Sequence, residues 1–243
     1  MSIPKRSTRV SLCMVCANSE DTLPRFFRWA VPRFAEIVVV RSESQDSTDA
    51  IVAEQLRAHP GQIRDYFRKI DDITHQKQHC VDRATRSWRL VIDADELIED
   101  TDWDHLVTQM DAVGCDMGGF PRYNLQVDDQ HYCTDWYPDV QARLFNRRVY
   151  FNKEPRYQTH HRMDGARGGK VFHELHILHW GNIRPSHQLA WKSKMRAQYA
   201  ATDYIEGKEL ASFEDWFSER NRTLDTLRAP LPERVAATVR AWR

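Results

Sequence analysis

Two carboxylates separated by one residue follow an apolar run near the middle of the sequence. Asp93 and Asp95 belong to the stretch Asp93-Ala94-Asp95-Glu96, and residues 88–92 before it are typical of a buried strand. In an open α/β sheet the ligand lies outside the carboxyl ends of the strands, so polar residues at this position are candidates for binding. Carboxylate oxygens suit Mg2+ or Mn2+, and a cation held here could bridge the phosphates of a nucleotide diphosphate. A solvated acidic turn is the ordinary alternative, and the spacing alone does not choose between the two.

The elements around this motif alternate between short β-rich runs and helical patterns. This alternation predicts an α/β fold in which a mixed, mainly parallel sheet is flanked by helices. Gly165, Gly168 and Gly169 predict a flexible loop that could act as a lid. We expect strands at residues 10–17, 36–40, 62–67, 88–92, 114–127, 140–151 and 171–180.

The C-terminal part of the sequence has a different character. Residues 1–185 are expected to form the α/β domain, and residues 186–243 a helical extension. The basic and aromatic residues of the extension are compatible with packing on the core or with peripheral contact to an anionic membrane surface. His160 and His161 are candidates for contact with donor phosphates.

Composition excludes several classes of protein. The 35 Lys and Arg residues are balanced by 35 Asp and Glu residues, so we expect no nucleic-acid partner. The five cysteines are scattered and odd in number, which favours buried thiols in a reducing compartment over a disulfide framework. No apolar run reaches the roughly 20 residues that span a bilayer. We therefore expect a cytoplasmic protein that is soluble or peripheral to the inner face of a membrane.

Four segments, in order, resemble glycosyltransferase family 2, whose members have the GT-A fold with a Rossmann-like nucleotide-binding sheet. The turn Arg41-Ser42-Glu43-Ser44-Gln45-Asp46-Ser47-Thr48 is similar to the family's Asp-Ser-Gly-Ser-x-Asp-x-Thr turn, and Asp93-Ala94-Asp95-Glu96 matches its metal motif. The branch that it resembles includes lipopolysaccharide-core and cell-surface polysaccharide transferases. The matching segments are residues 10–20, 36–48, 76–96 and 136–145. The resemblance implies that residues 1–185 form the nucleotide-sugar-binding and catalytic domain.

This resemblance implies an inverting, metal-dependent transfer of a sugar from a nucleotide diphosphate sugar to a hydroxyl of a glycan or lipid-linked saccharide acceptor. Asp95 and Asp93 are the expected ligands of Mn2+ or Mg2+. Asp139 is the expected base that deprotonates the acceptor hydroxyl, with Asp135 in reserve. The expected donor-binding residues are Asn18, Arg41, Asp46, Lys77, Asp93 and Arg143.

Three histidines near the end of the matching region form a second cluster. On a single strand, His173 would face away from His176 and share its side only with His179, so the three cannot all bind one ion. Members that resemble this chain carry a His-Glu pair near here, and a C-terminal His often completes the metal site of GT-A enzymes. His173 is therefore the expected third metal ligand.

Two departures from the family pattern affect the donor pocket. Arg41 stands where the family usually has an Asp that contacts the nucleotide, and Ser19 stands where a Glu often follows the Asn. Arg41 could bind a phosphate, or it could pair with Glu43 or Asp46. A non-catalytic carbohydrate-binding protein with a degraded donor pocket is the alternative function. A nucleotidyltransferase ranks behind both, because no Gly-rich phosphate loop follows the first strand.

Overall fold

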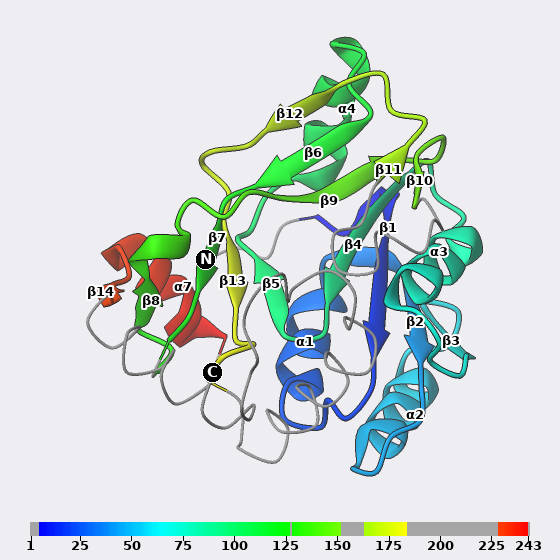
Figure 1. Cartoon of the computed structure of the whole chain (residues 1–243). Coiled ribbons are helices and arrows are strands. Elements are labelled where there is room, and N and C mark those ends of the chain that lie inside the picture. The colour runs from blue at the N-terminus through cyan, green and yellow to red at the C-terminus, as the bar shows by residue number, and fades with distance from the viewer. Residues whose placement is uncertain (1–4, 127, 152–162, 184–227, 243) are drawn as a thin grey trace, which may run out of the picture.

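The computed structural model describes residues 5–126, 128–151, 163–183 and 228–242, and its centre is a seven-stranded sheet (Figure 1). The order of the strands is β12-β6-β9-β4-β1-β2-β3. Strand β9 is antiparallel to both of its neighbours, and the other adjacent pairs are parallel. The expected mixed, mainly parallel sheet is therefore confirmed. Its strands are β1 (Ser7–Cys16), β2 (Phe34–Arg41), β3 (Ile63–Phe67), β4 (Trp88–Asp93), β6 (Met117–Phe120), β9 (Gln141–Asn146) and β12 (Gly169–Val171).

Helices cover both faces of this sheet, because its central strands are apolar on both sides. On β1, Leu12 and Met14 point to one face, where they pack in a cluster with residues of α1 and α4. Cys13 and Val15 point to the other face, where they pack in a cluster with residues of α3. The helices are α1 (Leu23–Ala30), α2 (Thr48–Ala58), α3 (Ile73–Arg83), α4 (Trp103–Ala112) and α7 (Glu233–Ala241).

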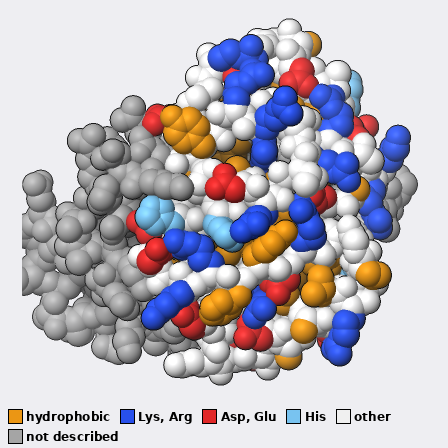
Figure 2. All heavy atoms as spheres, turned by 90° about the vertical axis from the view of Figure 1, so that its right-hand side faces the viewer, with side chains coloured by type: hydrophobic (Ala, Val, Ile, Leu, Met, Phe, Trp, Pro, Cys, Tyr) orange, Lys and Arg blue, Asp and Glu red, His pale blue; other side chains and the backbone are white. Residues whose placement is uncertain are grey.

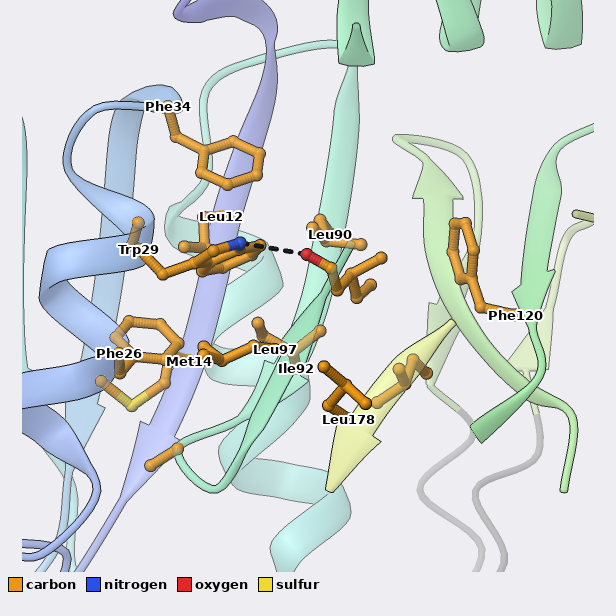
Figure 3. Packing of buried hydrophobic residues seen from close by; sticks show 14 of the residues in the cluster. Leu12, Met14, Phe26, Trp29, Phe34, Leu90, Ile92, Leu97, Phe120 and Leu178 are labelled. Atoms are coloured by element: carbon orange, nitrogen blue, oxygen red, sulfur yellow. Dashed lines mark hydrogen bonds between the residues drawn. The ribbon is translucent and has the colours of Figure 1, made fainter. Parts of the chain in front are cut away.

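A second, three-stranded sheet lies against α1. Strand β13 (Ile177–His179) is the middle strand, between β5 (Glu96–Ile98) and β7 (Arg122–Asn124). The buried indole of Trp29 donates a hydrogen bond to the carbonyl oxygen of Ile98 at 3.0 Å, which ties α1 to this sheet (Figure 3). The small sheet therefore brings the end of the family-like region next to the turn that follows β4.

Shorter elements complete the described chain. The strands β8 (His131–Cys133) and β14 (Arg228–Pro230) pair with each other, as do β10 (Tyr150–Phe151) and β11 (Met163–Asp164), and η1 (Thr134–Trp136) is a short 3-10 helix. Helix α7 places Val235 and Val239 in the same core cluster as α1. His160, His161 and most of the expected extension lie outside the described residues, so its boundary stays a prediction.

The described surface carries charges of both signs. Lysine and arginine side chains are interspersed with acidic ones over the side of the molecule that carries α2 and α3 (Figure 2). Among the described residues, no helix combines the length and the apolar character that a bilayer crossing requires.

Three expected long strands are wrong. The stretch 140–151 divides at a turn into β9 and β10. The stretch 114–127 divides at Pro121 into β6 and β7, and the stretch 171–180 divides at a turn into β12 and β13. In these last two cases the chain leaves the large sheet and enters the small one. Proline favours such an exit, because it lacks the N–H that would continue the hydrogen bonds of the ladder.

Asp116 anchors the glycine-rich loop that was expected to be a flexible lid. Its side chain is buried and accepts hydrogen bonds from Arg148 Nη1 at 2.9 Å, Arg167 Nε at 2.8 Å and the Arg167 backbone N at 3.1 Å. Gly165 has a φ of +86°, and a Cβ there would collide with the carbonyl oxygen of Arg148. These contacts fix the loop to the sheet and argue against a lid.

Replacement of this carboxylate should destabilise the protein. We expect Asp116→Ala to lower the free energy of unfolding by about 2 kcal/mol, because charge-assisted hydrogen bonds are lost while both arginines, which are exposed, regain water. Urea titration measures this quantity. Asp111→Ala is the matched control, because Asp111 pairs with Arg9 at the exposed surface and such pairs contribute little. Equal effects of the two substitutions would contradict the anchoring role.

Candidate active site

The candidate site lies at the edge of the sheet where the parallel strands end. Because β1, β2 and β4 run in the same direction, Asn18, Arg41 and Asp93 follow or end their strands at this edge. Strand β9 runs the opposite way and begins at the same edge, so Asp139 lies just before it. The topology therefore gathers the expected site residues from distant parts of the sequence.

Three expected donor-binding residues meet in a buried ionic network. Lys77 Nζ lies 3.0 Å from one oxygen of Asp93, and Arg143 Nη2 lies 3.3 Å from the other. Burial alone would raise the pKa of Asp93, but Lys77 and Arg143 outweigh it and hold that pKa well below its usual range. Burial lowers the pKa of Lys77, and Asp93 opposes that effect. Asp93 is thus engaged by two cations of the protein itself.

The network continues through Glu96, which is completely buried. One oxygen of Glu96 accepts hydrogen bonds from Arg143 Nη2 at 2.6 Å and from Arg122 Nη1 at 2.8 Å. Burial opposes ionisation of Glu96, yet Arg143 and Arg122 lower its pKa. Arg122 then pairs with Asp139, with its Nη2 2.5 Å from Oδ2. Positive and negative groups alternate along the whole chain of contacts, which is the arrangement that makes buried charge tolerable.

The two carboxylate oxygens of Asp139 differ in the hydrogen bonds that they accept. Its Oδ2 accepts from Arg122 Nε at 2.9 Å and from Asn124 Nδ2 at 2.9 Å, and its Oδ1 accepts from Gln141 Nε2 at 2.5 Å. Burial raises its pKa, but Arg122 and Asn124 have the larger combined effect and lower it. The side chain keeps 25% of its surface exposed. Asp135, the reserve candidate, is exposed in η1.

Asp95 lies beside His179. Both side chains are buried, and His179 Nε2 is 3.8 Å from Asp95 Oδ2. That distance is too long for a hydrogen bond. Adjacent ligands of an octahedral Mg2+ or Mn2+ ion, each about 2.1 Å from it, are roughly 3 Å apart, so Asp95 and His179 could share a cation only if they moved closer by somewhat less than ~1 Å. The described residues contain no group of three His, Cys, Asp or Glu side chains that could hold a metal.

His173 does not occupy the place expected of it. It is exposed in the turn between β12 and β13, whereas His179 stands on β13 opposite Glu96 and Asn124. The expectation rested on the alternation of side chains along a single strand, and the turn breaks that alternation. The structure therefore pairs His179, not His173, with Asp95.

Asn18 and Asp46 join two loops at the same edge. Asn18 has a φ of 44° and accepts a hydrogen bond on Oδ1 from the backbone N of Gln45 at 2.7 Å. Asp46 accepts from the backbone N of Glu20 at 3.1 Å and from that of Thr48 at 3.0 Å. These contacts hold the loop after β1 to the loop after β2, so both residues shape the edge where the donor is expected.

Arg41 is paired, but not with the acids that the sequence suggested. Its Nε lies 2.8 Å from an oxygen of Asp65 and its Nη1 lies 2.7 Å from Asp49, whereas the sequence offered a phosphate, Glu43 or Asp46 as alternative partners. Asp65 comes from β3, the neighbouring strand, and Phe67 at the end of β3 is 56% exposed. Asp65 thus supplies a carboxylate beside the position where the family usually has one.

Three residues of this site had no role in the sequence-based reading, namely Arg122, Asn124 and His179. Arg122 and Asn124 are the polar positions of an alternating three-residue strand. That alternation was the available signal, but a run of three is too short to separate from chance.

The family model described as glycosyl transferase family 2 matches residues 11–176. A TPR repeat-containing protein of Synechococcus elongatus is 31% identical over 103 residues, which are 42% of this chain and 24% of that protein. The chain thus spans only about a quarter of the curated relative that it matches.

Solved structures resemble this one at low sequence identity. A mannosyltransferase from Pyrobaculum calidifontis in complex with GDP-Man and Mn2+ is 18% identical with a TM-score of 0.50, covering 88% of this chain and 69% of that one. TarS of S. aureus is 14% identical with a TM-score of 0.48, covering 82% of this chain and 41% of that one.

The expected fold agrees with that of the mannosyltransferase. Because the family model covers residues 11–176, well over half of the 243 residues, the chain belongs to glycosyl transferase family 2.

Proposed function

We propose that this protein is a metal-dependent, inverting glycosyltransferase that moves a sugar from a nucleotide diphosphate sugar to a hydroxyl of a glycan or lipid-linked saccharide. The observation that carries the proposal is the buried pair of Asp95 and His179, 3.8 Å apart at the carboxyl edge of the sheet. The mannosyltransferase of similar fold was solved with GDP-Man and Mn2+, which supports this class of donor and ion.

Asp95 and His179 are the groups that would hold the divalent cation. When bound, the cation supplies positive charge that stabilises the leaving diphosphate. Asp93 has a different task in this proposal, because Lys77 and Arg143 neutralise it. It fixes the start of the turn that carries Asp95, and it remains available for a contact with the ribose or with water.

Asp139 is the proposed base. A general base needs an ionised carboxylate with a lone pair directed to the acceptor hydroxyl. The lowered pKa keeps Asp139 ionised. Within the described part of the chain, Oδ2 accepts from Arg122 and Asn124 while Oδ1 accepts from Gln141 alone. Oδ1 therefore has capacity for a further hydrogen bond.

One observation favours the non-catalytic alternative. Both Arg41 and the nearby Asp65 are already engaged in an ion pair where the family usually offers a carboxylate to the nucleotide. A carbohydrate-binding protein with a degraded donor pocket would be silent in transfer and donor-hydrolysis assays, for the wild type and for Asp95→Ala alike.

Loss of a proposed metal ligand should abolish metal-dependent donor binding. We expect Asp95→Ala and His179→Ala each to weaken Mn2+-dependent binding of the nucleotide sugar by at least about 100-fold, because only two protein ligands are proposed. Calorimetric titration of UDP-, GDP- and dTDP-sugars with and without Mn2+ measures the effect. His173→Ala is the matched control and should bind as the wild type does. Absence of Mn2+-dependent binding of all three donors to the wild type would exclude the proposal.

Loss of the proposed base should slow transfer without weakening donor binding. We expect Asp139→Asn to lower kcat by about 10³-fold, within the range for general bases, because the amide cannot accept the proton. Asp135→Asn should retain kcat within a few-fold. Steady-state kinetics gives both values, and calorimetry with the donor checks that the pocket is intact. A large loss in Asp135→Asn with little loss in Asp139→Asn would reverse the two assignments.

A further inference from the structure

Asn124 connects the proposed base to the proposed metal ligand. We propose that Asn124 is a positioning residue that selects the Nδ1–H tautomer of His179 and thereby presents the Nε2 lone pair on the side of Asp95. The metal-binding part of this inference rests on the proposed function. The evidence is a series of hydrogen bonds whose directions are fixed, one after another, by Asp139.

The contact with Asp139 determines which end of the Asn124 amide donates its hydrogen bond. An ionised carboxylate can only accept hydrogen bonds, and the contacts of Asp139 with Arg122 keep it ionised. The Asn124 atom 2.9 Å from Asp139 Oδ2 must therefore be the NH2 group. The carbonyl oxygen of the same amide is consequently turned away from Asp139 and toward His179.

The contact with Asn124 determines which ring nitrogen of His179 carries the hydrogen. Asn124 Oδ1 lies 2.7 Å from His179 Nδ1, and a carbonyl oxygen can only accept. His179 Nδ1 must therefore carry the hydrogen. In the neutral ring the lone pair is then on Nε2, the nitrogen 3.8 Å from Asp95 Oδ2. A neutral amide achieves this without adding negative charge next to Asp139.

The backbone holds the two side chains in this relation. His179 and Asn124 are register partners on the parallel strands β13 and β7, and both are buried. The backbone N of Leu125 donates to the carbonyl oxygen of His179 at 3.0 Å, directly beside this pair. The hydrogen bond therefore depends on the pairing of two strands and not on a loose loop.

Three variants separate this role from simple support of the fold. Asn124→Leu removes both hydrogen bonds of the amide. Asn124→Asp keeps an acceptor for Nδ1 but loses the donor to Asp139. Asn146→Leu is the matched control, because Asn146 is also buried but pairs with Trp88 at the opposite end of the sheet. Thermal unfolding of each variant establishes that it is folded.

The first measurement is the tautomer of His179 in the metal-free protein. Nitrogen NMR of the imidazole at neutral pH reports it, with the resonance assigned by its absence in His179→Gln. We expect the Nδ1–H form in the wild type, in Asn146→Leu and in Asn124→Asp, and its loss in Asn124→Leu. An Nε2–H ring in the wild type, or an unchanged Nδ1–H ring in Asn124→Leu, would overturn the inference. If Asn124→Leu does not fold, an Nε2–H ring in Asn124→Asp overturns it.

The second measurement is the affinity for Mn2+ by calorimetry. We expect Asn124→Leu to bind Mn2+ about 10–100-fold more weakly, the usual effect of removing a partner that orients a ligand. Asn124→Asp should bind at least as tightly as the wild type. Equal affinities of Asn124→Leu and the wild type would contradict the positioning role. A wild type that binds no Mn2+ would refute the proposed metal site, whereas the tautomer measurement would still decide the role of Asn124.

Discussion

A buried row of alternating charges is the constraint on which the rest of the site depends. Lys77, Asp93, Arg143, Glu96, Arg122 and Asp139 follow one another through contacts of 2.5–3.3 Å. Charges removed from water are tolerated only when each has partners of opposite sign. The row therefore forces α3, β4, β9, β5 and β7 into one relative arrangement. Loss of Asp93, for example, would remove the ion-pair partner of the buried Lys77.

This row divides the polar residues of the site into two groups. Lys77, Arg143 and Arg122 neutralise carboxylates of the protein. Contact of Lys77 and Arg143 with the donor stays a prediction. The groups proposed for chemistry lie beside this row. They are Asp95, which follows Asp93 in the turn, and Oδ1 of Asp139 at the far end. Asn124 links these two groups. It hydrogen-bonds Asp139 on one side and, on the other side, His179, which lies beside Asp95.

The edge of the sheet around Arg41, where the donor is expected to bind, shows how the structure accommodates a departure from the family pattern. Arg41 replaces the usual Asp, and Asp65 on the adjacent strand pairs with it, so the edge gains no unbalanced positive charge. The loops beside it remain braced through Asn18 and Asp46. A pocket with this altered edge is expected to recognise its nucleotide through different contacts from those of the usual family member.

The sequence by itself predicted the parallel strands β1, β2, β3 and β4, their alternation with helices and the acidic turn. Buried strands such as β2 and β4 are continuous apolar runs, and α1 has apolar residues at helical spacing, so local pattern and tertiary position agree. Only the tertiary structure decided which histidine meets Asp95 and which acids pair with Arg41. The strands β5, β7 and β13 have three residues each, too few to show a period, and they pair over long separations such as the 55 residues between Asn124 and His179. An ion pair forms between side chains that lie close together in the folded structure. The residues next to Arg41 in the sequence do not report which distant residues, such as Asp65, will be close to it.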